Sequence, residues 1–198
     1  MVGYYFVSVI CSIIHCMLFN LFGKKEEAPQ SIFTDRCYQT TNAKLKACAA
    51  LAKEQPGTWF ICWFASTQKL FKDYFTQQGL DETLIIDARN FNSAMLINKK
   101  AVFTEHHPLH SKELELVKNW TQQPIIVYSA MDEPLFVHFG SEKMLGLMKL
   151  LGMKEDEVIE HSLVTKSIIK GQDKIAGMVE LEQSAQSQKE WLEKNLVK

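Results

Sequence analysis

The sequence lacks the motifs on which nucleotide-hydrolysing proteins and cysteine-based metal sites depend. Its 198 residues contain no GxxxxGK[ST] phosphate loop and no GxGxxG fingerprint, so no glycine-rich turn is available to cradle phosphates. No CxxC pair occurs, and the five cysteines are an odd number. We therefore expect reduced thiols in a cytosolic protein rather than a disulfide framework or a cysteine zinc site.

The sequence also lacks an excess of charge of either sign. The formal net charge is −1, and the basic residues are scattered rather than gathered in a long Lys/Arg run. Such a chain has no basic field to hold nucleic acid by counterion release, so no nucleic-acid partner is expected. A composition of 46% hydrophobic and 23% charged residues is that of an ordinary globular domain with a core.

The N-terminal segment 1–22 is mostly apolar and has about the length of a bilayer span. It is a poor secretory signal, because no Lys or Arg precedes the apolar run and no A-x-A-like cleavage site follows it. Two interpretations stay open. The segment is a membrane anchor, with Lys24 and Lys25 holding the rest of the chain in the cytoplasm, or it extends upstream of a normal cytosolic start near Met17. Residues 23–31 are expected to form a linker.

Residues 32–161 alternate apolar runs with helical patterns. The apolar runs at 58–64, 84–88, 101–104 and 124–128 predict strands, and the longest of them predicts a strand buried on both faces. Apolar residues at helical spacing predict helices over 43–54, after Ser66 or Thr67, and after Ser111. The alternation predicts an α/β fold with a single doubly wound parallel sheet.

The C-terminal third predicts helices joined by a turn. Ser141 is expected to act as the N-cap of a helix with a broad apolar face, and Gly152 is expected to end that helix. One long helix is then predicted over 162–198, with only a thin apolar stripe. We expect this helix to lie on the domain surface or to dock a partner, and a chain truncated after Gly177 to keep a folded core.

An ordered set of short motifs spans residues 128–168. It consists of YSAMDE at 128–133, FGS at 139–141, a methionine-rich helix, LG at 151–152, an acidic run at 155–157, IEH at 159–161 and VTKSI at 164–168. In this order the motifs resemble the C-terminal part of the second nucleotide-binding domain of SecA, the preprotein-translocase motor, where that domain runs into the helical scaffold. The positions that match the family are Asp132, Glu133, Phe139, Gly140, Ser141, Gly152 and His161. The resemblance implies a RecA-like sheet, and it is weak outside 128–168.

The resemblance also shows which catalytic part is missing. SecA-like motors supply arginines to the γ-phosphate from a run that follows a Thr-Glu-Arg-His motif, whereas residues 104–124 here contain no arginine. Without that charge the transferring phosphoryl group is not stabilised. The resemblance therefore implies a non-catalytic SecA-like protein, a protein–protein interaction or regulatory module linked to protein translocation. It would reside in the cytoplasm or at the cytoplasmic face of a membrane, where residues 1–22 could contact the bilayer.

Two alternatives involve a ligand. ATP would bind only if a separate P-loop domain completed the site, and no other cofactor is predicted. A metal-dependent hydrolase is the second alternative, because imidazoles and a carboxylate are zinc ligands. The candidate cluster is Glu105, His106, His107 and His110. Its spacing is not HExxH, and Pro108 breaks the helix that would present the histidines on one face, so a solvated loop is the plainer interpretation.

Two further sites have a structural and a functional interpretation. Asp132 and Glu133 follow a predicted strand, where α/β proteins often place their sites, but acids at a helix N-terminus are the simpler explanation. For His161 we expect a role at the joint between two helices rather than in catalysis.

Overall fold

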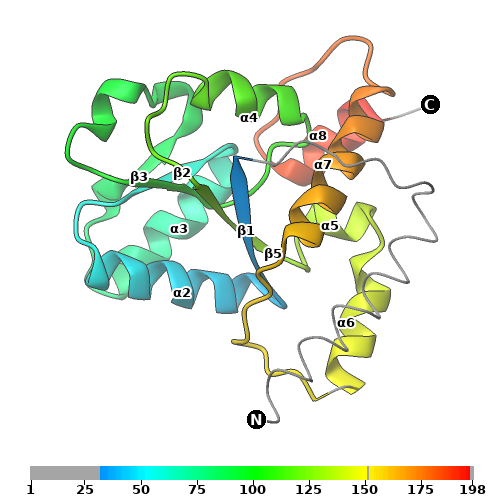
Figure 1. Ribbon diagram of the computed structural model, residues 1–198, viewed down its shortest axis with the longest axis horizontal. Coiled ribbons are helices and arrows are strands. Elements are labelled where there is room, and N and C mark those ends of the chain that lie inside the picture. Colours follow the sequence, from blue (N-terminus) through cyan, green and yellow to red (C-terminus); the bar gives the residue numbers. More distant parts are fainter. Residues whose placement is uncertain (1–31, 151, 197–198) are drawn as a thin grey trace. The chain divides into compact units, whose positions relative to one another are not determined.

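The computed structural model describes residues 32–150 and 152–196, and they form an α/β fold. Five parallel strands make one sheet in the order β1–β5–β4–β2–β3 (Figure 1). The strands are β1 Phe33–Tyr38, β2 Trp59–Cys62, β3 Ile85–Asp87, β4 Ala101–Phe103 and β5 Ile125–Ala130. The parallel sheet and the four predicted strands are thus confirmed. The apolar segment 1–22 and the linker 23–31 lie outside the described residues.

Strand β1 is the element that the sequence did not reveal. Its charged residues Asp35 and Arg36 interrupt the apolar pattern, although four of its six residues are buried. The strand pairs with β5 along its whole length, from Phe33 opposite Ile125 to Tyr38 opposite Ala130. It therefore extends the sheet by one edge strand beside β5.

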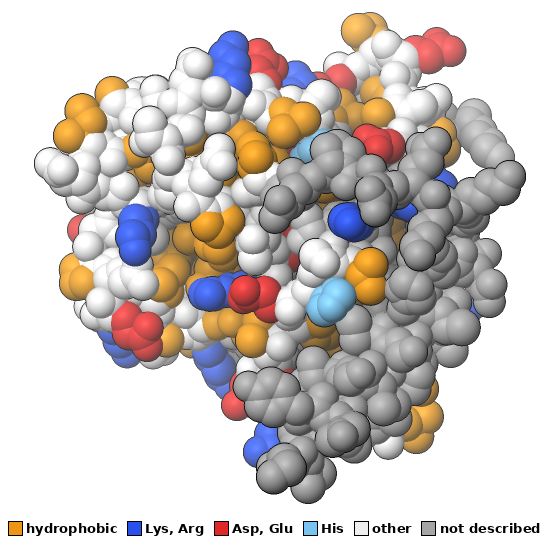
Figure 2. All heavy atoms as spheres, in the orientation of Figure 1, with side chains coloured by type: hydrophobic (Ala, Val, Ile, Leu, Met, Phe, Trp, Pro, Cys, Tyr) orange, Lys and Arg blue, Asp and Glu red, His pale blue; other side chains and the backbone are white. Residues whose placement is uncertain are grey.

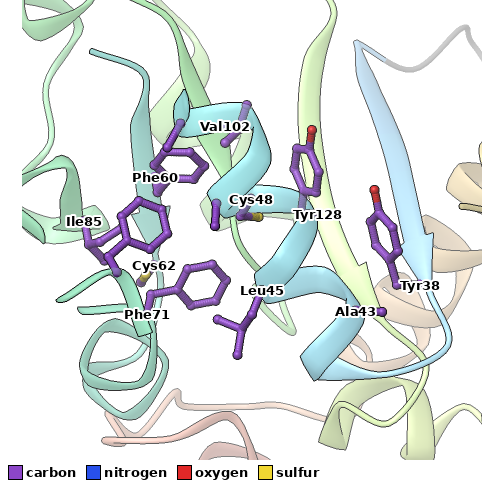
Figure 3. Packing of buried hydrophobic residues seen from close by; sticks show 13 residues of the cluster. Tyr38, Ala43, Leu45, Cys48, Phe60, Cys62, Phe71, Ile85, Val102 and Tyr128 are labelled. Carbon is purple, nitrogen blue, oxygen red and sulfur yellow. The ribbon is translucent and has the colours of Figure 1, made fainter. Parts of the chain in front are cut away.

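Helices α2 (Thr41–Glu54) and α3 (Ala65–Gln77) cover one face of the sheet. Figure 3 shows Leu45 and Cys48 of α2 and Phe71 of α3 packed against Phe60 and other side chains of the strands. The buried members of this core are Tyr38, Ala43, Leu45, Cys48, Ala49, Ala52, Phe60, Cys62, Phe71, Phe75, Ile85, Val102 and Tyr128. Both helices lie at the predicted positions, with α2 beginning two residues earlier.

The opposite face is covered by α4 (His110–Val117) and by the aromatic rings of Phe91 and Trp120. Between β3 and β4 the chain makes three short 3-10 turns, Glu82–Leu84, Ala88–Asn90 and Ser93–Leu96. Helices on both faces make the sheet doubly wound, as predicted.

A third core lies where the C-terminal helices meet the sheet. These helices are α5 (Pro134–His138), α6 (Ser141–Leu150), α7 (Ser162–Ala176) and α8 (Gln188–Asn195). The buried apolar side chains of this core are Cys37, Phe64, Leu109, Met131, Leu135, Phe136, Val164, Ile168, Ile175 and Trp191. Met148 is a deeply buried apolar residue of α6, while Leu150 at the end of the helix is 85% exposed.

The prediction of one long helix over 162–198 is wrong, because the chain forms two helices in this range. Helix α7 ends at Ala176 with Gly177 as its C-cap. Helix α8 is capped by Ser187, whose side-chain hydroxyl oxygen accepts a hydrogen bond from the Glu190 amide. Trp191 is only 1% exposed, so the C-terminal residues contribute to the core. The expectation that truncation after Gly177 leaves the core intact loses its physical basis, because the truncated chain would lack this buried side chain.

No helix among residues 32–150 and 152–196 has both the length and the apolar character needed to cross a bilayer. On the face drawn in Figure 2, basic and acidic side chains are interspersed.

Candidate functional site at the carboxyl edge of the sheet

Buried polar residues gather where β2, β4 and β5 end. Glu105 and His106 follow β4, and Glu133 follows β5; all three are buried. In open α/β sheets, ligands bind outside the carboxyl ends of the strands, so this edge is the first place to look for a site.

A buried ion pair links α2 to the end of β5. Lys44, in the first turn of α2, is 2% exposed, forms an ion pair with Glu133 and donates to the Thr104 carbonyl oxygen at 2.6 Å. The same Glu133 oxygen, Oε1, accepts the Ala130 amide at 3.1 Å. Burial lowers the pKa of Lys44, but the nearby carboxylates of Glu133 and Glu105 outweigh it, so its pKa is raised overall. Lys44 is therefore a buried cation.

Glu105 caps the start of α3 from inside the protein. Its Oε1 accepts the amides of Trp63 and Phe64 at 3.0 and 3.1 Å, and its Oε2 accepts the Thr67 hydroxyl at 2.7 Å. Burial raises the pKa of Glu105 to about 7, and Lys44 and these hydrogen bonds oppose the rise. Glu105 thus satisfies orphan amides at the N-terminus of α3, although Ser66 or Thr67 was the expected cap.

The raised pKa of Glu105 predicts a measurable pH dependence. The pKa rises from an ordinary 4.5 to about 7 on folding, so the folded state binds the proton more tightly between these values. The contribution of Glu105 to stability then falls as pH rises from 4.5 through 7, by about 3 kcal/mol in total. Glu105→Gln keeps an acceptor for the amides but does not ionise. We expect this variant to gain stability relative to the wild type between pH 5 and pH 8, measured by urea unfolding.

The matched control for that experiment is Glu115→Gln, which changes an exposed glutamate of α4. A stability difference between Glu105→Gln and the wild type that stays constant from pH 5 to pH 8 would contradict the buried ionisation.

His106 lies between two buried carboxylates. Its Nδ1 is 2.9 Å from Glu113 Oε1, and its Nε2 forms an ion pair with Asp35 of β1. Burial lowers the pKa of His106, but the charges of Glu113 and Asp35 outweigh it and hold the pKa well above its usual value. The ring is therefore an imidazolium that bridges β1 and α4.

The Glu113 carboxylate accepts hydrogen bonds from residues of several elements. It accepts the His107 amide at 2.8 Å, pairs with His110 Nδ1 at 3.0 Å and accepts Gln172 Nε2 of α7 at 3.1 Å. Burial raises the pKa of Glu113, but His106 and these donors lower it to about 2 overall. Gln172 also donates to the His107 carbonyl oxygen at 2.7 Å. Glu113 thus joins the end of β4 to α7.

The structure does not arrange the predicted cluster of Glu105, His106, His107 and His110 as a metal-ligand set. Glu105 faces α3, both ring nitrogens of His106 contact carboxylates, and His107 Nδ1 accepts the Leu109 amide at 3.0 Å. Across residues 32–150 and 152–196, no three His, Cys, Asp or Glu side chains are placed to hold a metal ion. The interpretation of this segment as a solvated loop is also wrong, because Glu105, His106 and His107 are buried.

Two of the family-matching side chains accept a backbone amide at a helix N-terminus. Both Asp132 carboxylate oxygens accept the Thr41 amide, at 2.8 and 2.9 Å, so this residue caps α2 from the end of β5. His161 Nδ1 accepts the Leu163 amide at 3.1 Å and caps α7.

The FGS motif, Phe139, Gly140 and Ser141, and Gly152 shape the chain around α6. Gly140 and Gly152 have φ values of 86° and 74°, the left-handed region that favours glycine. The Phe139 ring lies against Gly171 of α7, where an added Cβ would be 2.5 Å from the ring. Ser141 differs from the expectation, because its hydroxyl donates to the Met131 carbonyl oxygen at 2.5 Å instead of accepting a backbone amide.

Sequence reasoning missed the partners Asp35, Lys44, Glu113 and Gln172. Lys44 carried a usable signal, since it precedes Cys48 by four residues on the apolar side of α2. The others are polar residues in a strand or on helices, and only the tertiary structure brings Asp35 and Glu113 to His106 and Gln172 to Glu113.

Comparison with known proteins finds relatives that match part of the chain. The chain is 54% identical over 48 residues to the protein translocase subunit SecA of Acidithiobacillus ferrooxidans, which is 24% of this chain and 5% of that protein. It is 43% identical over 51 residues to the SecA of Coxiella burnetii, and 44% identical over 50 residues to that of Alkaliphilus oremlandii. These matches cover 26% and 25% of this chain and 6% of each relative. No family model matches the chain.

The chain therefore contains a SecA-related segment. The matched stretch spans about a twentieth of the length of these curated relatives.

Proposed function

We propose that this chain is a non-catalytic, SecA-related interaction module that works with the protein-translocation machinery in the cytoplasm or at the cytoplasmic face of a membrane. We infer that its related segment corresponds to the C-terminal part of the second, RecA-like nucleotide-binding domain of SecA. Its relatives are protein translocase subunits, which supports the setting.

One observation carries the non-catalytic role. The charged groups at the carboxyl edge contact one another and the backbone: Lys44 pairs with Glu133, Glu105 caps α3, and His106 bridges Asp35 and Glu113. Their hydrogen bonds join β1, α2, α3 and α4 to the strand ends. Residues used in this way stabilise the fold and are not held ready for a phosphate group.

The interaction role draws support from exposed apolar side chains in the SecA-like stretch. Val137, Leu150 and Val158 lie within 128–168 and are exposed. Covering exposed apolar side chains with a partner is favourable, so we expect this stretch to supply contact surface.

Calorimetric titration of the full chain with Mg-ATP and Mg-ADP tests the non-catalytic role. We expect no binding up to millimolar nucleotide, because the sequence has neither a phosphate loop nor the arginine run. Micromolar binding would overturn the proposal.

Capture of SecA from native cells tests the translocation setting. We expect the tagged full chain, cross-linked before lysis, to retain SecA, and Leu150→Lys to lower the yield about tenfold, the effect of losing about 1.4 kcal/mol of binding free energy. Ile97→Lys is the matched control, because Ile97 is 72% exposed and lies outside the SecA-like stretch. Equal yields for the two variants would contradict binding through this stretch.

A further inference from the structure

The C-terminal residues fold back over the carboxyl edge of the sheet and are hydrogen-bonded to one another. We call residues 178–196 the C-terminal strap. Asn195 donates to the Gln183 carbonyl oxygen at 3.0 Å and accepts the Gln183 amide at 2.6 Å, and Lys194 donates to the Ser184 carbonyl oxygen at 3.3 Å. These bonds lie within the strap and join Gln183 and Ser184 to the end of α8.

Gln188 attaches α8 to the backbone at the edge. Its Nε2 donates to the His106 carbonyl oxygen at 3.0 Å, and its Oε1 accepts the Leu135 amide at 2.7 Å. One buried glutamine thus pairs with a donor and an acceptor from two different elements. A side chain without both an amide N–H and a carbonyl could not make this pair of bonds.

Trp191, three residues later on the same side of α8, is the second attachment. Its ring centroid is 5.7 Å from that of His107, at an interplanar angle of 75°. The outward residues Lys189, Glu193 and Lys194 are exposed. Val179, Ala185, Leu192 and Leu196 add partly buried apolar contacts. The buried side chains of α8 are thus a glutamine and a tryptophan spaced i, i+3.

Glu182 fastens the strap at the protein surface. It accepts the indole N–H of Trp191 at 3.0 Å, pairs with Lys112 of α4 at 3.0 Å, and lies 3.4 Å from His107 Nε2. The Glu182 and Lys112 side chains are 25% and 45% exposed, so solvent and partners reach this contact. One further backbone bond, from the Ser66 amide to the Gln186 carbonyl oxygen at 3.0 Å, ties the strap to α3.

We propose that the strap is releasable and that the surface under α8, formed by His106, His107 and Leu135, is a binding site for an amphipathic helix of a partner protein. The partner helix carries a glutamine and, three residues later, a tryptophan, as α8 does. The chain's own α8 occupies this site until a partner helix displaces it. The inference deepens the proposed function by naming the class of partner, and it rests on that function only for the cellular setting.

The test uses the purified full chain and a fluorescein-labelled peptide with the sequence of residues 183–196. In Glu182→Ala the strap loses its fastening, so a larger fraction of molecules has the site free. We expect the peptide to bind this variant about tenfold more tightly than Glu180→Ala, measured by fluorescence anisotropy, because apparent affinity scales with the free fraction. Glu180 is an exposed neighbour of the same charge, which makes it the matched control. A peptide carrying Trp191→Ala should bind at least tenfold more weakly.

Hydrogen exchange in the same two variants makes the result decisive. We expect the amides of α8 to exchange at least tenfold faster in Glu182→Ala than in Glu180→Ala, while those of β5 are unchanged. If the amides of α8 exchange together with those of β5 in both variants, the proposal that the strap is releasable is contradicted. Fast exchange of α8 without peptide binding would overturn the binding site. Both measurements use the isolated chain and peptide, so their failure is distinct from a failure to capture SecA.

Discussion

Replacing Lys44 with methionine is expected to lower the free energy of unfolding by about 3–5 kcal/mol. Methionine preserves most of the side-chain volume beside Phe71, over whose ring the ammonium lies at 5.3 Å. It removes the positive charge that faces Glu133 and Glu105, and Glu133 then remains a buried carboxylate without its ion pair. The loss is the free energy of leaving a buried charge uncompensated. Urea unfolding at pH 7 measures it.

Lys46→Met is the matched control for this prediction, because Lys46 is exposed on the same helix. We expect its effect to stay within about 0.5 kcal/mol. Adding Glu133→Gln to Lys44→Met should recover much of the lost stability, because the second change removes the uncompensated charge. If Lys44→Met unfolds at the same urea concentration as Lys46→Met, the ion pair contributes nothing.

Replacing His106 with leucine should destabilise the fold by a similar amount, about 3–5 kcal/mol at pH 7. The imidazolium lies between Asp35 and Glu113, and its removal leaves two buried carboxylates without the cation between them. His138→Leu is the control, because His138 is exposed. An effect of His106→Leu no larger than that of His138→Leu would show that the ring is not the cation that bridges the two acids.

The His106→Leu effect should also depend on pH in a defined direction. The raised pKa of His106 gives stability that is fully present below about 6.5 and lost as pH rises through the folded-state value. The pKa of Glu113, lowered to about 2, gives stability that is present above its usual 4.5 and lost as pH falls toward 2. The difference between wild type and variant should therefore be largest near pH 5–7 and shrink in acid, as thermal unfolding across pH would show.

The sequence predicted the fold where periodicity is strong. The apolar runs at 58–64 and 124–128 gave strands because a strand buried on both faces needs apolar residues throughout. Strand β1 escaped notice because Asp35 and Arg36 gain partners only in the folded protein: His106 for the first, Tyr128 and Glu160 for the second. The predicted C-terminal helix is too long because a polar stretch with few helix-breaking residues has a helical pattern throughout. In the structure a second helix, α8, begins after Ser187, which caps it, and Trp191 of this helix is buried.

The candidate site was only half predictable for the same reason. Asp132 and Glu133 stood out because they follow a predicted strand, and the structure places them after β5. Glu105 and His106 stood out because a carboxylate and several imidazoles lie close together in the sequence. Their roles depend on residues distant in sequence: Lys44 meets Glu133, and Gln172 meets Glu113. Side-chain type alone suggested metal ligands for the histidines, whereas the buried carboxylates around them make one an imidazolium.

The strand order has a consequence for how the protein is made. Strand β5 lies between β1 and β4, so β1 has no neighbour in the sheet until residue 125 has been synthesised and has left the ribosome. Until then the nascent chain carries a strand with both edges open, beside a separate β4–β2–β3 sheet with an unpaired edge. Open strand edges are the surfaces that chaperones protect and that aggregation uses. Synthesis of β5 is therefore the event that joins β1 to the rest of the sheet.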